Sequence, residues 1–332
     1  MTKKRLFALL TAVVMTLSLA ACGGSGAASG AASGAASAET SADKGTIALC
    51  IAQTTNEFQS RIMDAMFAYA EENGLDEKYN FTVFDAQFDT ATQLQQVENA
   101  ISQGVDGIIM IAVDMQGSVA AVNAANDAGV PIVGVNTDII DNTLFTSYVG
   151  SDNVESGVIE MTALAEAMEG EGKLVEMHGN YGEAPQLQRD EGIRKVLADY
   201  PGIEIVAEDS GLWSRDSALE LMENWIQSGV MDDVKAVVAH NDSMAVGAMI
   251  ALEEAGMDNV LIAGIDANAD MLGYLKEGRV AVTVFQNAAE QGAQGVAQMM
   301  KILNGEDYEQ IMWIPYELVS ADSADQYLAL YE

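Results

Sequence analysis

The sequence predicts an α/β protein with two doubly wound parallel-sheet lobes. Short β-branched runs alternate with longer amphipathic stretches along most of the chain, which is the pattern of βαβ units. Several runs are continuously apolar, as in parallel strands that are covered on both faces. Eleven strand candidates are many for one open sheet, and the alternation of strand and helix patterns pauses near residues 147–153 before a new series begins. We therefore expect two lobes.

The individual elements follow from the same pattern. Strands are expected at 46–52, 81–85, 107–111, 132–135, 147–149, 173–178, 203–209, 236–240, 261–265, 280–285 and 311–316. Helices are expected between them, at 57–73, 91–104, 118–128, 154–169, 187–199, 215–228, 243–255, 271–276 and 288–304. Several of these helical stretches are followed by a glycine, such as Gly129 and Gly256, and glycine is the usual residue just after a helix.

The N-terminus has the pattern of an export signal. Three basic residues precede an apolar run, 6–21, that is too short for a spanning helix. The run ends Leu-Ala-Ala-Cys at 19–22, which resembles the lipobox of bacterial lipoproteins, where cleavage precedes a lipid-carrying cysteine. This predicts a signal peptide at 1–21 and lipid attachment at Cys22. An ordinary secretory signal with a chance cysteine is the alternative.

A Gly/Ala/Ser-rich segment follows the cysteine, with GAAS repeated three times. Its side chains are too small to form a core, so 22–44 is expected to be a lipidated, flexible tether. Cys50 is the other cysteine, and it would have no partner for an intrachain disulfide. Its apolar neighbours predict a buried core residue.

Composition and missing motifs exclude several functions. The chain has 15 basic and 50 acidic residues, which opposes nucleic-acid binding. Neither the two histidines nor the cysteines have zinc spacing, and no calcium loop or dinucleotide motif is present. No metal, cofactor or enzyme activity is therefore expected.

Polar and aromatic residues follow most of the predicted strands directly. Ligands of open α/β sheets bind beyond these carboxyl ends, and amides, carboxylates and guanidinium groups match vicinal hydroxyls. One asparagine or aspartate after a strand is more often a helix cap, but the recurrence favours a shared pocket. Its strongest candidates are Asn136, Arg189, Asn241, Asp266 and Gln286, with Phe58 and Trp213 as rings for the C–H face of a sugar.

Residues 45 to about 327 resemble the periplasmic sugar-binding proteins of ABC importers, of the ribose- and galactose-binding type (type I periplasmic binding proteins). The most specific motifs are Ala-His-Asn-Asp-Ser-Met-Ala-Val-Gly-Ala at 239–248 and Ala-Gly-Ile-Asp-Ala at 263–267. Further motifs are Gly-Val-Asp-Gly-Ile-Ile at 104–109, Gly-Val-Pro-Ile-Val at 129–133, Gly-Ser-Asp-Asn at 150–153 and Arg-Asp-Glu-Gly-Ile at 189–193.

This resemblance implies a chain that crosses between the lobes three times, near 150, 286 and 314. The N-terminal lobe would comprise 45–150 plus 287–314, and the C-terminal lobe 151–286 plus 315–332. The implied sugar-binding positions are Asn56, Phe58, Asn136, Arg189, Trp213, Asn241, Asp266 and Gln286.

Some positions depart from the ribose-binding pattern. Asn136-Thr137 stands where that type has Asp-Arg, so we expect Asp138 to join the site. Gln59 replaces a second aromatic residue, and Ala112 replaces an asparagine. These changes preserve a site for a sugar but put ribose in doubt.

The implied function is an extracytoplasmic, lipid-anchored monomer that captures a monosaccharide or similar polyol and delivers it to an ABC permease. A ligand-sensing module for a membrane sensor kinase or chemoreceptor would use the same lobes, and the sequence does not separate the two.

Overall fold

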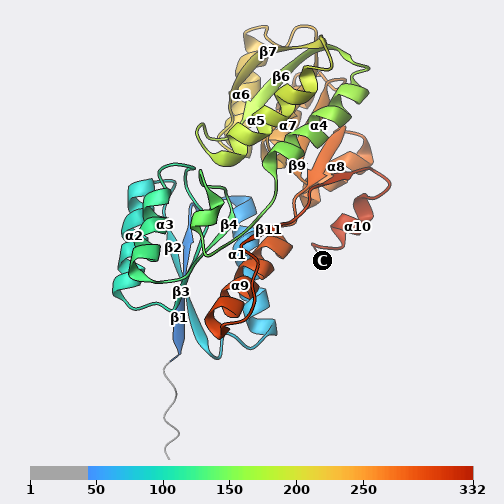
Figure 1. Cartoon of the computed structure of the whole chain (residues 1–332). Coiled ribbons are helices and arrows are strands. Elements are labelled where there is room, and N and C mark those ends of the chain that lie inside the picture. The colour runs from blue at the N-terminus through green and yellow to red at the C-terminus, as the bar shows by residue number, and fades with distance from the viewer. Residues whose placement is uncertain (1–43, 332) are drawn as a thin grey trace, which may run out of the picture. The chain divides into compact units, whose positions relative to one another are not determined.

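The computed structural model describes residues 44–331. The predicted signal peptide, Cys22 and nearly all of the predicted tether lie outside the described residues. Within 44–331, no helix has both the length and the apolar composition that crossing a membrane requires. The described chain forms two mostly parallel six-stranded sheets with helices on both faces (Figure 1), which confirms the predicted fold class.

The first lobe is built on a sheet with strand order β2-β1-β3-β4-β5-β11, and every neighbouring pair is parallel. Its strands are β1 (Gly45–Ile51), β2 (Tyr79–Asp85), β3 (Gly107–Met110), β4 (Ile132–Asn136), β5 (Ser147–Gly150) and β11 (Ile311–Trp313). Its helices are α1 (Glu57–Glu72), α2 (Thr90–Ser102), α3 (Val119–Ala128), the short 3-10 helix η1 (Asn142–Leu144) and α9 (Ala288–Asn304).

The second lobe repeats this plan with strand order β7-β6-β8-β9-β10-β12. Its strands are β6 (Glu171–His178), β7 (Gly202–Ser210), β8 (Val234–Ala239), β9 (Leu261–Asp266), β10 (Val282–Phe285) and β12 (Glu317–Val319). Its helices are α4 (Asn153–Ala167), α5 (Ala184–Leu197), α6 (Arg215–Gln227), α7 (Asp242–Glu254), α8 (Ala269–Glu277) and the short α10 (Ala324–Leu328), which the sequence pattern did not predict.

The continuous apolar runs are explained by the two-sided cover of each sheet. In β1, Ile47 and Leu49 belong to the core beneath α1 and α9, whereas Ala48 and Cys50 belong to the core beneath α2 and α3. Successive side chains of a strand point to opposite faces, so both sets must be apolar. Cys50 is fully buried, as predicted, and burial raises the pKa of its thiol to about 12.

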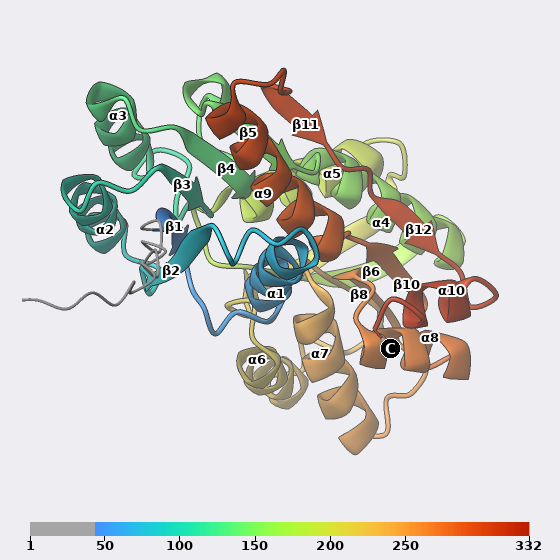
Figure 2. The ribbon, with the colours of Figure 1, turned by 90° about the horizontal axis from the view of Figure 1, so that it is seen from below.

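The chain passes between the two sheets three times: after β5, after β10 and after β11. The crossing after β10 leads back to the first lobe and places α9 beside α1, although the two helices are far apart in sequence (Figure 1). The crossing after β11 leads to the second lobe again, where β12 pairs antiparallel with β10 (Figure 2).

The prediction of one strand at 311–316 was therefore wrong. Ile311–Trp313 pairs with β5, and Glu317–Val319 pairs with β10 of the other sheet. Pro315 lies between the two segments, and it has no N–H to donate to a ladder. The apolar residues on either side of it gave no local sign that the chain changes sheets, and only the family resemblance implied a crossing near 314.

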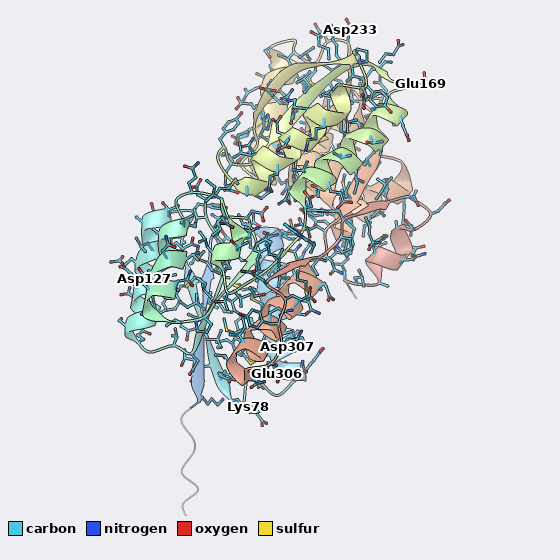
Figure 3. All side chains as sticks on the ribbon, in the orientation of Figure 1. Lys78, Asp127, Glu169, Asp233, Glu306 and Asp307 are labelled. Atoms are coloured by element: carbon cyan, nitrogen blue, oxygen red, sulfur yellow. The ribbon has the colours of Figure 1, made fainter. Side chains whose placement is uncertain are left out.

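Charged side chains cover the outside of both lobes. The labelled residues Asp127, Glu169 and Asp233 extend outward from different elements (Figure 3), and all three are exposed. The acidic excess is thus a property of the solvated surface, where it supports solubility.

Candidate ligand-binding site

One cavity lies where the carboxyl ends of strands from the two sheets face each other, and it encloses about 450 Å³, including the part open to solvent. Its lining consists of Asn56, Phe58, Gln59, Asn136, Thr137, Asn153, Glu183, Pro185, Arg189, Trp213, Asn241, Asp266 and Gln286.

Eight of the nine residues predicted from the sequence to bind ligand line this cavity. The exception is Asp138, which is buried but absent from the lining; its Oδ1 accepts a hydrogen bond from Asn142 Nδ2 at 2.5 Å. Burial raises the pKa of Asp138. The geometry thus gives Asp138 a role in the loop after β4, and we do not include it in the proposed contact set.

Five lining residues were not among the sequence candidates: Gln59, Thr137, Asn153, Glu183 and Pro185. Gln59 and Thr137 stand at positions where the sequence departs from the ribose-binding pattern, so a signal for them existed. Glu183 and Pro185 lie beyond the polar residues that follow β6 directly, at the start of α5. Asn153 begins α4 just after a crossing between sheets. Spacing from a strand end does not identify these three.

Two candidate asparagines are helix caps as well as cavity residues. Asn56 Oδ1 accepts a hydrogen bond from the backbone N–H of Gln59 at the start of α1, and Asn241 Oδ1 accepts one from Met244 at the start of α7, both at 3.0 Å. Each cap satisfies an N–H that lacks an intrahelical partner. The carboxamide is thereby held in one orientation, and its Nδ2 is left to donate to a ligand.

Arg189 organises the second-lobe wall of the cavity. Its guanidinium is buried and donates from Nη1 to the carbonyl of His240, and from Nη2 to Gln286 Oε1 at 3.0 Å and to Tyr316 Oη at 3.2 Å. Tyr316 Oη in turn donates to Asn153 Oδ1 at 2.7 Å. This network joins residues from α5, the segment just after β10, the last crossing and α4, so it fixes a charged donor beside the segments that cross between the sheets.

Asp266 and Asn136 lie in strained backbone conformations at the ends of β9 and β4. Asp266 has φ of 133° and Asn136 has φ of 69°, and such conformations concentrate at functional sites. Asn136 is held by a hydrogen bond from its Nδ2 to Gln291 Oε1 at 3.0 Å and by one from Tyr148 Oη to its carbonyl at 2.8 Å. Burial raises the pKa of Asp266 to about 7, against the opposing effect of Arg189.

Aromatic rings from both lobes contribute to the lining. Phe58 comes from α1 of the first lobe, and Trp213 comes from the loop after β7 of the second. The Trp213 ring also lies 5.6 Å from the Arg189 guanidinium carbon. Such rings can cover the apolar faces of a small ring whose edge carries hydroxyl groups.

Direct contacts between the lobes lie close to this cavity. Ser243 Oγ of α7 donates to Glu57 Oε2 of α1 at 2.8 Å. Arg61, also on α1, donates to Asn268 Oδ1 and lies 5.0 Å from the centre of the Tyr331 ring. These contacts require the two lobes to be near each other, so they stabilise a closed arrangement.

Arg61→Ala should therefore weaken ligand binding by about 2- to 10-fold, since a hydrogen bond contributes about 0.5–1.5 kcal/mol. Isothermal titration with the tightest polyol measures this change. Lys276→Ala is the matched control, because its ion pair with Asp325 lies within the second lobe. Equal affinities of the Arg61 variant and the wild type would contradict a closure role.

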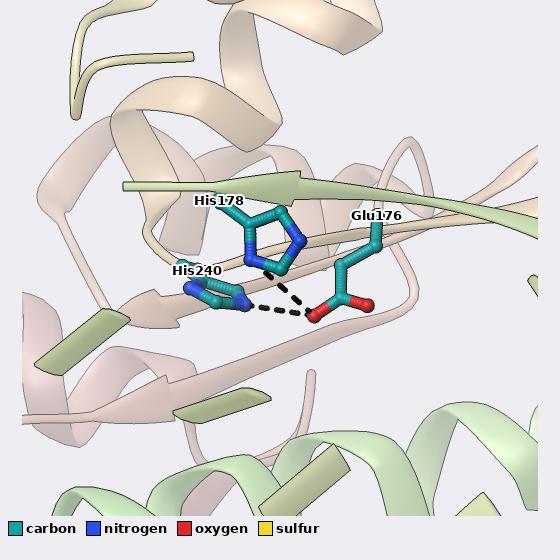
Figure 4. A group of neighbouring side chains, drawn as sticks. All are labelled: Glu176, His178 and His240. Atoms are coloured by element: carbon teal, nitrogen blue, oxygen red, sulfur yellow. Dashed lines mark hydrogen bonds and ion pairs between the residues drawn. The ribbon is translucent and has the colours of Figure 1, made fainter. Parts of the chain in front are cut away.

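Glu176, His178 and His240 form a buried group at the carboxyl ends of β6 and β8 (Figure 4). Their donor atoms lie within 4.8 Å of one another, because β6 and β8 are neighbouring strands. Sequence spacing did not reveal this grouping. His240 Nε2 and Glu176 Oε1 are 3.0 Å apart, which is hydrogen-bonding distance, and Arg194 Nη2 lies 3.1 Å from Glu176 Oε2. A metal ion would lie beside this guanidinium in a closed interior, and both features oppose its binding.

This group predicts a pH dependence of stability. Burial raises the pKa of Glu176 to about 8 and lowers that of His240 to about 3. Between about pH 4.5 and 8 the folded protein keeps the Glu176 proton that the unfolded chain has lost, so Glu176 makes stability fall as pH rises, by at most about 1.4 kcal/mol per unit. His240 acts in the opposite direction between about pH 3 and 6.5, where the unfolded chain binds a proton that the folded protein lacks, so a net fall from this pair is expected above about pH 6.5.

Glu176→Gln should flatten the decline in the free energy of unfolding between about pH 6.5 and 8, as measured by urea titration. The exposed Glu166→Gln variant on α4 serves as the control and should keep the wild-type slope. An unchanged slope in the Glu176 variant would show that Glu176 is ionised throughout this range.

Comparison with known proteins places this geometry in a family. The model of the periplasmic binding protein domain matches residues 47–307. The chain belongs to the periplasmic binding protein family. A ribose import binding protein of Bacillus subtilis is 30% identical over 82% of this chain and 86% of its own length. A xylitol-binding protein of Mycolicibacterium smegmatis is 36% identical over 74% of this chain and 68% of its own length.

Solved structures of periplasmic binding proteins share the fold. An ABC transporter solute-binding protein from Bacillus halodurans with bound myo-inositol is 39% identical, with a TM-score of 0.81 over 86% of this chain and 98% of its own. One from Actinobacillus succinogenes with bound D-allose is 28% identical, with a TM-score of 0.78 over 86% of this chain and all of its own. These relatives are solute-binding proteins, which supports the prediction that this periplasmic binding protein is not an enzyme.

Proposed function

We propose that this protein is the solute-binding component of an ABC importer and that it captures a monosaccharide or cyclic polyol between its lobes. The observation that carries the proposal is the convergence of polar and aromatic side chains from both sheets on one cavity. A ligand that bonds to both walls binds the closed form more tightly than the open form, so it shifts the protein toward closure. A permease can then recognise the closed form.

The chemistry of the lining suits a neutral, polyhydroxylated ring. Asp266 accepts hydrogen bonds from hydroxyl groups, and Arg189 donates to their oxygens. The amide groups that remain available are donors on Asn241 Nδ2 and Gln286 Nε2 and an acceptor on Asn136 Oδ1. A cavity with such buried polar groups rejects a ligand that leaves them unpaired. Six-membered cyclic polyols are the first candidates, because the relative with bound myo-inositol has 39% identity.

The proposal includes the anchor and the lobes as the sequence predicts them. Lipid on Cys22 and a tether to residue 44 would hold a monomer at the outer face of the cytoplasmic membrane, or in the periplasm. The lobes would comprise 45–150 plus 287–314, and 151–286 plus 315–332. Metabolic labelling with a radioactive fatty acid tests the anchor, since Cys22→Ala should abolish the label.

A thermal-shift panel of cyclitols, pentoses, hexoses and acyclic polyols tests the main proposal. We expect at least one to raise the melting temperature in a concentration-dependent way. Mass spectrometry of the small molecules released from freshly purified protein would identify a retained ligand. No shift with any member of the panel, together with no released polyol, would overturn the proposal.

A further inference from the structure

Glu183 stands at the N-cap position of α5 but does not cap the helix. Its side chain accepts no hydrogen bond from the first turn of the helix, unlike the shorter Ser, Thr, Asp and Asn side chains that usually cap helices. The carboxylate instead lines the cavity, next to Pro185 and Trp213. The usual structural explanation for a polar residue at this position therefore does not account for Glu183.

The hydrogen bonds of Glu183 leave part of its accepting capacity free. Oε1 accepts from Asn180 Nδ2, and Oε2 accepts from Trp213 Nε1, each at 2.8 Å. An ionised carboxylate has about four acceptor sites, so about two remain. Both existing bonds hold the group in place, as a preorganised ligand contact requires.

No basic residue among those the structure describes compensates the charge of Glu183. The charged group that acts on it is Asp114, another carboxylate, and burial together with Asp114 raises the pKa of Glu183 to about 7. The guanidinium in the cavity, Arg189, is engaged by His240, Gln286 and Tyr316. A donor for the remaining acceptor sites of Glu183 can therefore come from the ligand.

We propose that Glu183 is a specificity-determining contact, which accepts a hydrogen bond from one hydroxyl or ammonium group of the ligand at the part of the cavity walled by Trp213. This inference rests on the proposed function and deepens it. It predicts that the protein discriminates strongly among polyols that differ at a single position. An ammonium group at that position would add a charge–charge attraction that a hydroxyl lacks.

Glu183 has a second effect that an experiment must separate from the first. Its bond to Nε1 fixes the Trp213 ring, whose carbon atoms lie so close to Gly179 that a Cβ there would come within 1.9 Å of them. Loss of Glu183 could therefore weaken binding through the ring alone. A loss of that kind would be the same for every ligand, whereas loss of a direct contact depends on the ligand group involved.

The test is a thermodynamic cycle that compares the loss of affinity on changing the protein with the loss on changing the ligand. Wild type, Glu183→Gln and Trp213→Phe are titrated by calorimetry with the tightest polyol of the panel and with each of its monodeoxy analogues. We expect Glu183→Gln to weaken binding of the parent polyol by about 10- to 100-fold. For one monodeoxy analogue, wild type and Glu183→Gln should bind equally, because the shared hydrogen bond is already absent. Trp213→Phe should weaken all ligands by a similar factor.

An amino-for-hydroxyl analogue at the identified position separates the two donor types. Wild type should bind it more tightly than the parent at pH 8, and Glu183→Gln should lose that preference; a preference for the parent would limit the site to hydroxyl donors. An equal loss for every analogue in Glu183→Gln would overturn the inference and leave a positioning role. If wild type binds no polyol, the proposed function fails instead.

Discussion

Arg189→Met should reduce ligand affinity at least about 100-fold, the largest effect expected from a single substitution in the cavity. The guanidinium is buried and is bonded to the His240 carbonyl, Gln286 and Tyr316. A hydrogen bond to a charged group contributes about 1.5–3 kcal/mol, so loss of the bonds that the guanidinium makes should cost about 3 kcal/mol or more, which corresponds to a factor of at least about 100. Isothermal titration with the tightest polyol measures the loss.

Two variants make this result specific. Arg189→Lys keeps the charge but loses the fixed fork of donors, so it should still lose at least about 10-fold. Arg279→Met removes an arginine of the same lobe that pairs with Glu253 away from the cavity, and it should bind like wild type. If Arg189→Met retained affinity within about 3-fold, the network would be structural and the ligand would bind elsewhere.

The sequence was sufficient for much of the fold because the local signals were redundant. Runs such as 107–111 are apolar at every position, and cover on both faces explains why. The sequence was insufficient where the fold depends on pairing between strands that are far apart in the chain. The residue pattern near Pro315 does not indicate that residues 311–313 and 317–319 join different sheets, since each segment is too short to carry a pattern. Only the family resemblance implied a crossing near 314.

The same distinction applies to the cavity. Residues that follow a strand directly, such as Asn136, Asn241 and Asp266, could be identified because strand ends converge in this type of sheet. Glu183 could not, since it reaches the cavity through a loop whose path depends on Asn180 and Trp213. The grouping of His178 with His240 was equally hidden, because it depends on which strands are neighbours.

Close packing of α4 on α5 connects the core of the second lobe to the cavity. A Cβ at Gly157 of α4 would lie 2.3 Å from the backbone carbonyl oxygen of Arg189, and one at Gly192 of α5 would lie 2.3 Å from that of Val154. Backbone atoms cannot turn aside as a side chain can. The two glycines therefore set the distance between these helices, and with it the position of Arg189.

Gly157→Ala should consequently destabilise the protein by about 1–3 kcal/mol, although alanine is the better helix former. The added methyl group must push α5 away, so the variant should also bind ligand more weakly. Urea unfolding measures the first effect and calorimetry the second. The two effects should occur together, because both arise from one displacement of the helix that carries Arg189.

The identical substitution at Gly273 provides the control. Gly273 lies within α8, and a Cβ there would meet no atom within 4 Å, so Gly273→Ala should stabilise the protein by about 0.5–1 kcal/mol through the lower entropy of the unfolded chain. Its ligand affinity should be that of wild type. Changes of opposite sign in the free energy of unfolding at Gly157 and Gly273 would show that contact between helices determines whether an added methyl group stabilises or destabilises the protein. A gain in stability at Gly157 would instead mean that α4 and α5 can separate without cost, and Arg189 would then not be held by helix packing.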